Sequence, residues 1–363
     1  MAGLAHQYPT APLGSRPTRL MLVDDSMVAR AVLSRMIEVS PDFEVVGVAG
    51  TAEDALIALR ETDVPVDIVL LDLEMPGMGG LKSLPEILDA AKGAQVLVVS
   101  SLAEDGAEAT VAALAMGAAD TLPKPGTGRF NGRFSDILLE RLRALVDGAT
   151  GAPREELRRP APPITRRRPM PEGALDLIAI GASTGGIHAL ATLFERLPAE
   201  VNAPIIVTQH LPSAFMTVFA RQLSTASGRP ASVAEHGDLL EPGHIYVAPG
   251  DHHLEVTSRK GRLFARLTDG RSASGCLPSV DPMFASAAFL GERVLGIVLT
   301  GMGRDGLEGG RVLVEGGGAI IAQDEESCAV WGMPRAISEA GLACAAVPPA
   351  EIAQLIRLRS KGE

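Results

Sequence analysis

Short apolar runs alternate with helical patterns along residues 18–146. The candidate strands are Leu20–Val23, Glu44–Ala49, Ile68–Leu71, Gln95–Val99 and a short segment near Thr121. The segments with apolar residues at helical spacing are Ser26–Val39, Ala52–Arg60, Gly80–Ala91, Glu104–Met116 and Ser135–Val146. Strands that alternate with helices favour a parallel sheet covered on both faces. The pattern therefore predicts an α/β fold, a doubly wound (βα)5 domain.

The same alternation returns in the C-terminal half of the chain. Its candidate strands are Leu177–Ile180, Ile205–Thr208, His244–Val247, Leu254–Val256, Leu263–Leu267, Val294–Thr300 and Gly318–Ala322. Helical patterns follow several of them, while the pair at 254–267 is joined through a turn that ends in Gly261 and predicts a β-hairpin. We expect a second, larger doubly wound parallel-sheet domain that contains this hairpin.

Two segments lack any apolar periodicity and set the predicted boundaries. Residues 1–17 contain Pro and Gly without a pattern, which is typical of a flexible leader. Residues 147–174 are rich in Pro and Arg and predict a linker. The expected domains are therefore 18–146 and 175–363.

Composition narrows the function classes. The net charge of −11 disfavours binding to a phosphate backbone, and with 3% aromatic residues there is little material for base stacking, so we expect no nucleic-acid partner. The apolar runs are far shorter than the ~20 residues that span a bilayer, so no membrane insertion is expected. The three cysteines are widely spaced, which disfavours a disulfide framework and fits a cytoplasmic protein.

Several polar residues follow the strands of the first domain. Asp24 and Asp25 follow the first strand, Asp72 follows the third, Ser100 ends the fourth and Lys124 follows the fifth. The carboxyl ends of parallel strands meet at one edge of the sheet, so we expect these groups to converge. Three carboxylates in one pocket repel one another unless a hard cation such as Mg²⁺ lies between them. A carboxylate beside Mg²⁺ can attack a phosphoryl group, and the hydroxyl and ammonium groups can then contact its oxygens.

A serine in the second domain has the setting of a nucleophile. Ser183 follows an apolar strand within the string GASTG, where glycines on both sides permit a sharp strand-to-helix turn. The amides that follow, beginning with Thr184, would lie at a helix N-terminus that favours an oxyanion. Glycine-rich turns of this kind also bind phosphates, and this alternative stays open at this point.

A histidine and an aspartate could complete a catalytic triad. His210 ends the strand after that of Ser183, and Asp305 lies in a glycine-rich loop after the strand at 294–300. These positions share the carboxyl edge of the sheet, where an imidazole could act as base and a carboxylate could orient it. Weaker histidine candidates are His188, His252 and His253. Asp281 competes with Asp305, but the sequence places it in a loop ahead of a helix, not directly after a strand.

Residues 18–146 resemble a response-regulator receiver domain. The resemblance rests on the acidic pair, the strand-end aspartate, the hydroxyl and the lysine described above. It implies that Asp24, Asp25 and Asp72 hold Mg²⁺ and that Asp72 is the phosphoacceptor. It also implies that Ser100 and Lys124 contact the phosphoryl group. Many receivers have an aromatic residue three positions before this lysine, where this chain has Thr121.

The second domain resembles the catalytic domain of the chemotaxis protein-glutamate methylesterases. The segments that carry the resemblance are GASTGG, TQH, APGD-x-H, PSVD, LTGMG-x-DG, IAQ and GMPR, in this order. The order Ser, His, Asp also differs from the order Ser, Asp, His of an ordinary α/β-hydrolase. The resemblance implies that Ser183 is the nucleophile, His210 the general base and Asp305 the orienting carboxylate. It also suggests the backbone amide of Met302 as an oxyanion donor.

Taken together, the two resemblances imply a phosphorylation-activated hydrolase. It would demethylate glutamate methyl esters, and deamidate glutamines, on methyl-accepting chemotaxis receptors. A chemotaxis histidine kinase would be the phosphodonor, Mg²⁺ would bind only in the receiver, and the esterase reaction would need no cofactor. Two departures from the family pattern, Leu277 before PSVD and Arg304 in the LTGMG segment, leave open a paralogue that acts on a non-chemotaxis receptor.

Three further interpretations stay as alternatives. A receptor-binding pseudoenzyme would need no working triad. A transcriptional response regulator would need a basic DNA-reading domain, and the C-terminal half shows no helix-turn-helix pattern. A dinucleotide-binding protein would need the G-x-G-x-x-G spacing, which the segment after the strand at 177–180 lacks.

Overall fold

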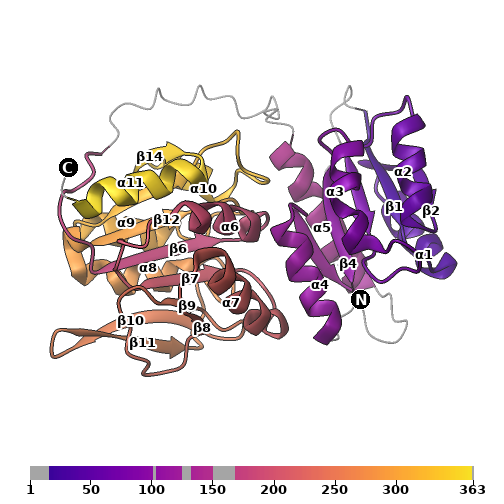
Figure 1. Ribbon diagram of the computed structural model, residues 1–363. Helices are drawn as coiled ribbons and strands as arrows, with labels where there is room; N and C mark the ends of the chain where they lie inside the picture. The colour runs from indigo at the N-terminus through magenta and orange to yellow at the C-terminus, as the bar shows by residue number, and fades with distance from the viewer. Residues whose placement is uncertain (1–15, 101–103, 125–131, 150–167, 362–363) are drawn as a thin grey trace, which may run out of the picture. The chain divides into compact units, whose positions relative to one another are not determined.

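The structure is a computed structural model that describes residues 16–100, 104–124, 132–149 and 168–361. The chain folds into two compact units, each with its own parallel sheet (Figure 1). This arrangement confirms the predicted α/β class with two doubly wound domains.

The first unit is built round a five-stranded sheet of order β2-β1-β3-β4-β5. Its strands are β1 (Thr18–Val23), β2 (Phe43–Ala49), β3 (Ile68–Leu71), β4 (Gln95–Ser100) and β5 (Asp120–Pro123). The helices of this half of the chain are α1 (Met27–Glu38), α2 (Ala52–Glu61), α3 (Gly80–Ala90), α4 (Glu104–Ala115) and α5 (Gly132–Ala149). The direction of strand addition reverses between β1 and β3, and ligands of such sheets bind at the carboxyl edge beside this reversal.

Local sequence signals explain where the helices begin. The side chain of Ser26 accepts a hydrogen bond from Ala29 N at the start of α1, and that of Thr51 accepts one from Asp54 N at the start of α2. Ser and Thr are favoured at this position because their oxygens satisfy amides that have no partner inside the helix. Helix α5 ends at Ala149, beyond the predicted end at Val146, so its last turn lies in the segment predicted as linker.

The second unit contains a seven-stranded sheet of order β14-β13-β12-β6-β7-β9-β8, in which every neighbouring pair is parallel. Its strands are β6 (Leu177–Ala182), β7 (Ile205–Gln209), β8 (Ala231–Val233), β9 (Ile245–Val247), β12 (Val294–Val298), β13 (Ala319–Gln323) and β14 (Ala343–Val347). The predicted hairpin is present as β10 (His253–Arg259) and β11 (Arg262–Thr268). Its two strands pair antiparallel from His253–Thr268 to Arg259–Arg262.

Two groups of helices cover the larger sheet (Figure 1). The helices are α6 (Gly186–Arg196), α7 (Ser213–Ser227), α8 (Val280–Ala287), α9 (Leu307–Glu315), α10 (Met333–Glu339) and α11 (Pro349–Lys361), with a short 3₁₀ segment at Ala288–Arg293. Helix α6 packs with α7 and α11, and α9 packs with α8 and α10. Right-handed crossovers that run outward from β6 in two directions place the two groups on opposite faces.

The core of the second unit forms where these helices meet the sheet. Four phenylalanines are fully buried there: Phe194, Phe215, Phe219 and Phe284. Truncating a buried phenylalanine to alanine typically costs about 3–5 kcal/mol, because both buried surface and packing are lost. The carboxyl ends of the central strands are therefore held on a rigid support.

Three features of this unit differ from the sequence prediction. Strands β8 and β14 were not predicted, because their segments ASV and ACAAV are short and dominated by small residues. Asp281 lies inside the first turn of α8, not in a loop ahead of it, because Ser279 is the residue that caps the helix. The Ser279 side chain accepts a hydrogen bond from Asp281 N, so the helix begins at Val280 and includes Asp281.

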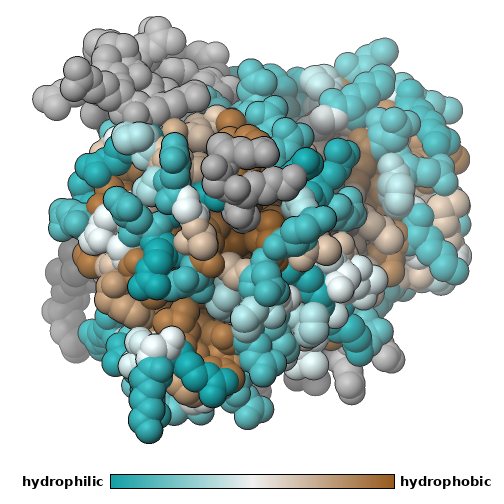
Figure 2. Space-filling view, turned by 60° about the vertical axis from the view of Figure 1, so that its left-hand side comes forward, coloured by the Kyte–Doolittle hydropathy of each residue, from teal (hydrophilic) through white to brown (hydrophobic). Residues whose placement is uncertain are grey.

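Hydrophilic side chains cover most of the face shown in Figure 2, with separate apolar patches among them. Most of the large apolar residues are in the interior, as the parallel strands show: every residue of β6, β7, β12 and β13 is buried. Among the described residues, none of the helices combines the length and the apolar character needed to cross a membrane.

Candidate functional site

The three residues predicted as a triad follow three adjacent strands. In the sheet β12, β6 and β7 are neighbours, with Val298 paired to Gly181 and Ala182 paired to Gln209. Ser183 and His210 follow directly after this last pair, and adjacent strands lie about 4.8 Å apart. Asp305 lies in the loop between β12 and α9. The site therefore lies at the carboxyl edge of β6, where the direction of strand addition reverses.

Close backbone packing fixes the turn that carries Ser183. Its N–H donates to Thr300 O at 3.0 Å, and its carbonyl oxygen accepts from Gln209 Nε2 at 2.8 Å. Gly185 caps α6 with φ of +76°, a conformation that favours glycine. A Cβ on Gly301 would lie 2.7 Å from the Cβ of Ser183. The loop after β12 can approach the serine only because that position is glycine.

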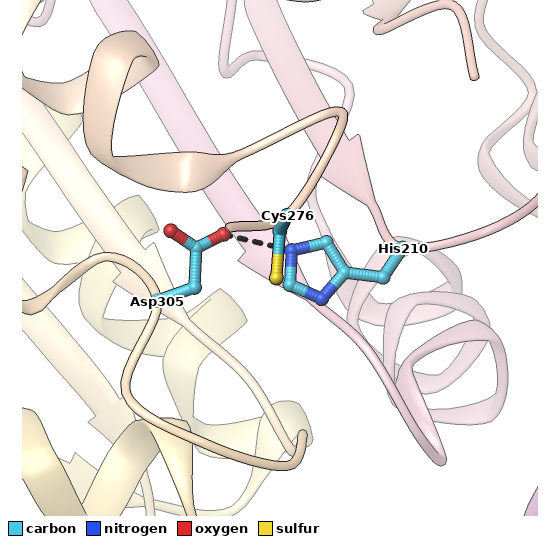
Figure 3. Close-up of side chains that lie close together, drawn as sticks. All are labelled: His210, Cys276 and Asp305. Carbon is cyan, nitrogen blue, oxygen red and sulfur yellow. Dashed lines mark hydrogen bonds and ion pairs between the residues drawn. The ribbon is translucent and has the colours of Figure 1, made fainter. Parts of the chain in front are cut away.

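His210 and Asp305 make direct contact. The distance from His210 Nε2 to Asp305 Oδ2 is 2.7 Å, and Asp305 is almost completely buried (Figure 3). In a neutral imidazole only one nitrogen carries a proton. If that proton lies on Nε2 and is donated to Asp305, Nδ1 keeps its lone pair and can accept a proton. The familiar Ser-His-Asp template uses the two nitrogens in the opposite sense.

Asp305 is held by several donors besides His210. Its Oδ1 accepts from Ser279 Oγ at 2.6 Å and from Gly306 N at 3.0 Å, and its Oδ2 accepts from Val280 N at 2.8 Å. Burial alone would raise the pKa of Asp305, but the hydrogen bond and charge of His210, together with the bonds from Ser279 and Val280, hold that pKa well below its ordinary value. Asp305 is therefore an ionised, fixed acceptor.

The pKa of His210 is shifted upward by this environment. Burial disfavours the charged imidazolium, but the contacts with Asp305 and Cys276 outweigh burial and raise the pKa of His210 to about 9. An imidazolium stabilised in this way is what a base needs after it has taken a proton.

Asp281, the competing carboxylate, has a different setting. Its Oδ1 accepts from Gly309 N at 2.8 Å, and it makes no hydrogen bond to His210 within the described residues. Burial, with the nearby negative charge of Asp305, raises the pKa of Asp281 to about 6. The geometry therefore joins His210 to Asp305 and ties Asp281 to the start of α9.

Ser183 lies beside this pair without a hydrogen bond to it. Within the part of the chain that the structure describes, Ser183 Oγ has no hydrogen-bond partner, and its residue is 6% exposed. Catalytic hydrogen bonds are often long in the absence of substrate. The backbone N–H groups of Thr184 and Met302 likewise have no acceptor among the described residues, so both are available to a ligand.

The acidic residues of the first unit also come together. One carboxylate oxygen from each of Asp24, Asp25 and Asp72 lies within 4.8 Å of the others. Lys124 Nζ lies 2.6 Å from Asp72 Oδ2 and 2.9 Å from Asp24 Oδ2. Ser100, the last residue of β4, is buried, and its carbonyl oxygen accepts from Lys124 N at 2.8 Å. All five residues predicted for this pocket thus belong to one edge of the sheet.

Charge in this pocket is unbalanced. Three carboxylates lie near one ammonium group, so the pocket has an excess of negative charge that a bound cation would neutralise. Burial raises the pKa of Asp72, and the hydrogen bond from Lys124 only partly offsets this effect. Burial would lower the pKa of Lys124, but its bonds to Asp72 and Asp24 raise it instead. A set of oxygen ligands with excess negative charge fits a hard divalent ion such as Mg²⁺.

Comparisons with known proteins agree with both units. Residues 178–356 match the family model of the CheB methylesterase, and residues 20–129 match that of the response regulator receiver domain. A Rhodospirillum rubrum protein named protein-glutamate methylesterase/protein-glutamine glutaminase 1 is 41% identical, over 95% of this chain and 95% of its own. The chain belongs to the receiver-linked CheB methylesterase family. A Caulobacter vibrioides member named protein-glutamate methylesterase/protein-glutamine glutaminase 2 is 42% identical, over 94% of this chain and 99% of its own.

One solved structure is also similar in sequence to this CheB-family chain. The Thermotoga maritima CheB methylesterase catalytic domain is 35% identical and aligns over 51% of this chain and 100% of its own, with a TM-score of 0.49.

Sequence reasoning missed the residues that support this CheB-type site. Gln209 holds the Ser183 carbonyl, and Gln323 Oε1 accepts from Thr300 N at 2.8 Å, which fixes the end of β12. Ser279 holds Asp305. These three residues lie in the segments TQH, IAQ and PSVD, so the signal was present, but spacing alone assigned them no role. Cys276, which lies beside His210, carried no signal at all.

Proposed function

We propose that this chain is a phosphorylation-activated methylesterase that hydrolyses glutamate methyl esters on methyl-accepting chemotaxis receptors. The observation that carries the proposal is the His210–Asp305 contact of 2.7 Å beside Ser183, at the carboxyl ends of adjacent strands. Ser183 is the nucleophile, His210 the general base and then acid, and Asp305 the orienting carboxylate. Family relatives named protein-glutamate methylesterase/protein-glutamine glutaminase support the activity, while the residue roles rest on the geometry of the site.

The first half of the reaction is acyl transfer to the serine. Ser183 Oγ attacks the ester carbonyl carbon while His210 Nδ1 takes the hydroxyl proton. Because Asp305 holds the proton on Nε2, Nδ1 is the nitrogen with a lone pair. The tetrahedral intermediate then collapses, the carbon–methoxy bond breaks, and Nδ1 returns the proton to departing methanol.

The second half restores the enzyme. Water attacks the acyl-enzyme, His210 takes its proton, and Ser183 leaves with that proton to regenerate the hydroxyl. A glutamine side chain passes through the same tetrahedral geometry and releases ammonia, so deamidation follows from the same groups. Neither half requires a metal or an organic cofactor.

The amides of Thr184 and Met302 are the proposed oxyanion donors. Both N–H groups lack an acceptor within the described residues. Thr184 follows Ser183 directly in the turn after β6, and Met302 follows Gly301, the residue of the loop after β12 that packs against Ser183. Removing one donor of this kind typically costs about 10²–10³-fold in kcat.

The first unit is proposed as the regulatory receiver. Asp24, Asp25 and Asp72 would hold Mg²⁺, which supplies charge compensation for a phosphoryl group when bound. Asp72 is the proposed phosphoacceptor, and Lys124 and Ser100 would contact the phosphoryl oxygens. Phosphorylation adds a charge of about −1.5 to −2 beside Lys124, so the unphosphorylated and phosphorylated receivers differ in the charge of this pocket.

The domain boundaries and partners belong to the same proposal. A receiver at 18–146 and a catalytic domain at 175–363 would be joined by the linker 147–174, most of which lies outside the described residues, as does most of the leader 1–17. The phosphodonor would be a chemotaxis histidine kinase, and the enzyme would act in the cytoplasm on the methylated helices of its receptor. Phosphorylation of Asp72 can shift activity only as far as it stabilises one of the two receiver states more than the other.

The experiment measures methanol release from methylated receptor with and without a small-molecule phosphodonor and Mg²⁺. Wild type should release methanol faster with the phosphodonor. Ser183→Ala should lose release under both conditions, and Asp72→Asn should keep only the basal rate. Unchanged release by Ser183→Ala would refute the nucleophile assignment, and stimulation of Asp72→Asn equal to wild type would refute the phosphoacceptor assignment.

One observation bears on which receptor is the substrate. Leu277, which directly follows Cys276, is 47% exposed. Arg304, which directly precedes Asp305, is also exposed. Both positions depart from the usual family residues, so they can alter recognition at the rim without altering the chemistry. Assays with chemotaxis and non-chemotaxis methylated receptors, compared for wild type and Leu277→Arg, test whether the rim has been changed for another substrate.

A further inference from the structure

Cys276 lies beside the catalytic histidine, and the proposed mechanism does not use it. Its Sγ, an imidazole nitrogen of His210 and a carboxylate oxygen of Asp305 all lie within 4.8 Å of one another. Figure 3 shows the sulfur and the carboxylate on the same side of the imidazole, near the nitrogen that Asp305 contacts. Cys276 is a free thiol and is only partly buried, so solutes can reach it.

A thiol, an imidazole and a carboxylate are the three ligand types that Zn²⁺ prefers in proteins. Bond lengths of about 2.0–2.3 Å place the ligand atoms of a tetrahedral site roughly 3.3–3.8 Å apart. The observed atoms need only modest side-chain shifts to reach this spacing. Asp305 is already held by Ser279, Val280 and Gly306, and such supporting bonds keep a ligand oriented.

We propose that His210, Cys276 and Asp305 form an inhibitory binding site for a soft divalent cation such as Zn²⁺. The ion would enter between His210 Nε2 and Asp305 Oδ2 and take Cys276 Sγ as its third ligand, with water in the fourth position. Mg²⁺ prefers oxygen ligands in octahedral geometry and does not fit this set. The site is therefore distinct in chemistry from the carboxylate cluster of the first unit.

Proton balance explains why the ion would inhibit. Binding requires the Cys276 thiol to release its proton to solvent, and Nε2 must lose its proton as well. An imidazolium loses this proton to solvent, whereas a neutral imidazole transfers it through solvent to Nδ1, so in either case the metal-bound ring carries its single proton on Nδ1. Nδ1 then has no lone pair and cannot take the proton of Ser183. This consequence rests on the proposed esterase function, whereas the binding of the ion does not.

The first test measures binding by the full chain. Calorimetric titration with ZnCl₂ in excess Mg²⁺ keeps the carboxylate cluster of the first unit occupied. Cys276→Ser should bind Zn²⁺ at least about tenfold more weakly than wild type. Loss of a residue that only supports a metal ligand typically lowers affinity by about tenfold or more, and loss of the ligand itself should lower it at least as much. Co²⁺ should give a thiolate-to-metal absorption band in wild type that Cys276→Ser lacks.

Cys328→Ser is the matched control, because burial raises the pKa of Cys328 to about 12 and keeps it an unreactive thiol. This variant should bind Zn²⁺ like wild type and keep the Co²⁺ band. Equal Zn²⁺ affinity in wild type and Cys276→Ser, or a Co²⁺ band that depends on Cys328, would overturn the proposed site.

The second test measures inhibition, with each variant compared with its own metal-free rate. Zn²⁺ should inhibit methanol release by wild type, and Cys276→Ser should need at least about tenfold more Zn²⁺ for the same inhibition. Inhibition at equal Zn²⁺ in both proteins would overturn the inhibitory role. If the chain released no methanol but still bound Zn²⁺ through Cys276, the esterase proposal would fail and the metal site would stand.

Discussion

Replacing Asp305 with asparagine tests the geometry of the site most directly. The side chain keeps its size, but one carboxylate oxygen becomes an amide that can only donate. In the wild-type protein, Oδ1 of Asp305 accepts hydrogen bonds from Ser279 Oγ and from the backbone N–H groups of Gly306 and Asp281. Its Oδ2 accepts from one backbone N–H, that of Val280, and contacts His210. Fewer donors oppose the amide at the Oδ2 position, so the asparagine NH₂ should face His210.

That orientation reverses the imidazole tautomer. An NH₂ group facing Nε2 requires a lone pair on Nε2, which moves the ring proton to Nδ1 and removes the base. The lost stabilisation of the imidazolium adds to this effect. The pKa of His210 is raised from 6.5 to about 9, which corresponds to about 3 kcal/mol, or roughly 10²-fold in rate, at about 1.4 kcal/mol per unit. Cys276 shares in that shift. With the wrong tautomer included, we expect a kcat loss of about 10²–10⁴-fold.

The assay is methanol release by the phosphorylated full chain, with Asp281→Asn as the matched control. Asp281 bonds Gly309 and not His210, so its variant should lose less than about tenfold in kcat. Circular dichroism and thermal unfolding establish whether both variants are folded. A folded Asp305→Asn enzyme with kcat within about tenfold of wild type, or a larger loss in Asp281→Asn, would refute the assignment of Asp305.

Three further predictions follow from the same contacts. Because His210 must be neutral to act as base and its pKa is raised to about 9, kcat/KM should rise with pH from 6.5 toward 9, and a flat profile over this range would contradict the base assignment. Gly301→Ala should lower kcat, because its Cβ would lie 2.7 Å from the Cβ of Ser183 and 2.6 Å from Sδ of the buried Met333; wild-type kcat would show that the loop can withdraw without effect. Lys124→Ala should weaken phosphorylation-dependent stimulation while basal release persists, because Lys124 Nζ contacts Asp72 at 2.6 Å; full stimulation would exclude Lys124 from the phosphoryl site.

The fold could be predicted because strand and helix patterns in this chain are strong. The strands of both sheets that were predicted are apolar runs bounded by polar turns, and the elements found in the structure differ from them by a few residues at their ends. Strands β8 and β14 could not be predicted, because ASV is only three residues long and ACAAV is mostly alanine, which favours helices over strands. Their strand conformation depends on pairing with β9 and β13, which local sequence does not encode.

Strand ends gave the position of the site residues but not their contacts. The sequence predicts that His210 and Asp305 share an edge, yet it does not say which imidazole nitrogen faces the carboxylate. That choice depends on how the loop before α9 directs Asp305, and on the donors that hold both of its oxygens. Cys276 could not be predicted at the site, because it comes from a loop that no strand end marks and it is brought to His210 only by tertiary packing.

The order of strands imposes a geometric demand that explains the glycine at position 181. Asp305 follows β12 and His210 follows β7, so the carboxylate must cross the end of β6, which lies between them. Val280 provides part of this bridge, since its N–H bonds Asp305 and its side chain packs over Gly181, where a Cβ would lie 2.6 Å from it. Any larger residue at Gly181 would push the bridge away from the end of β6. The first glycine of GASTGG therefore serves the contact between base and carboxylate as much as the turn of the serine.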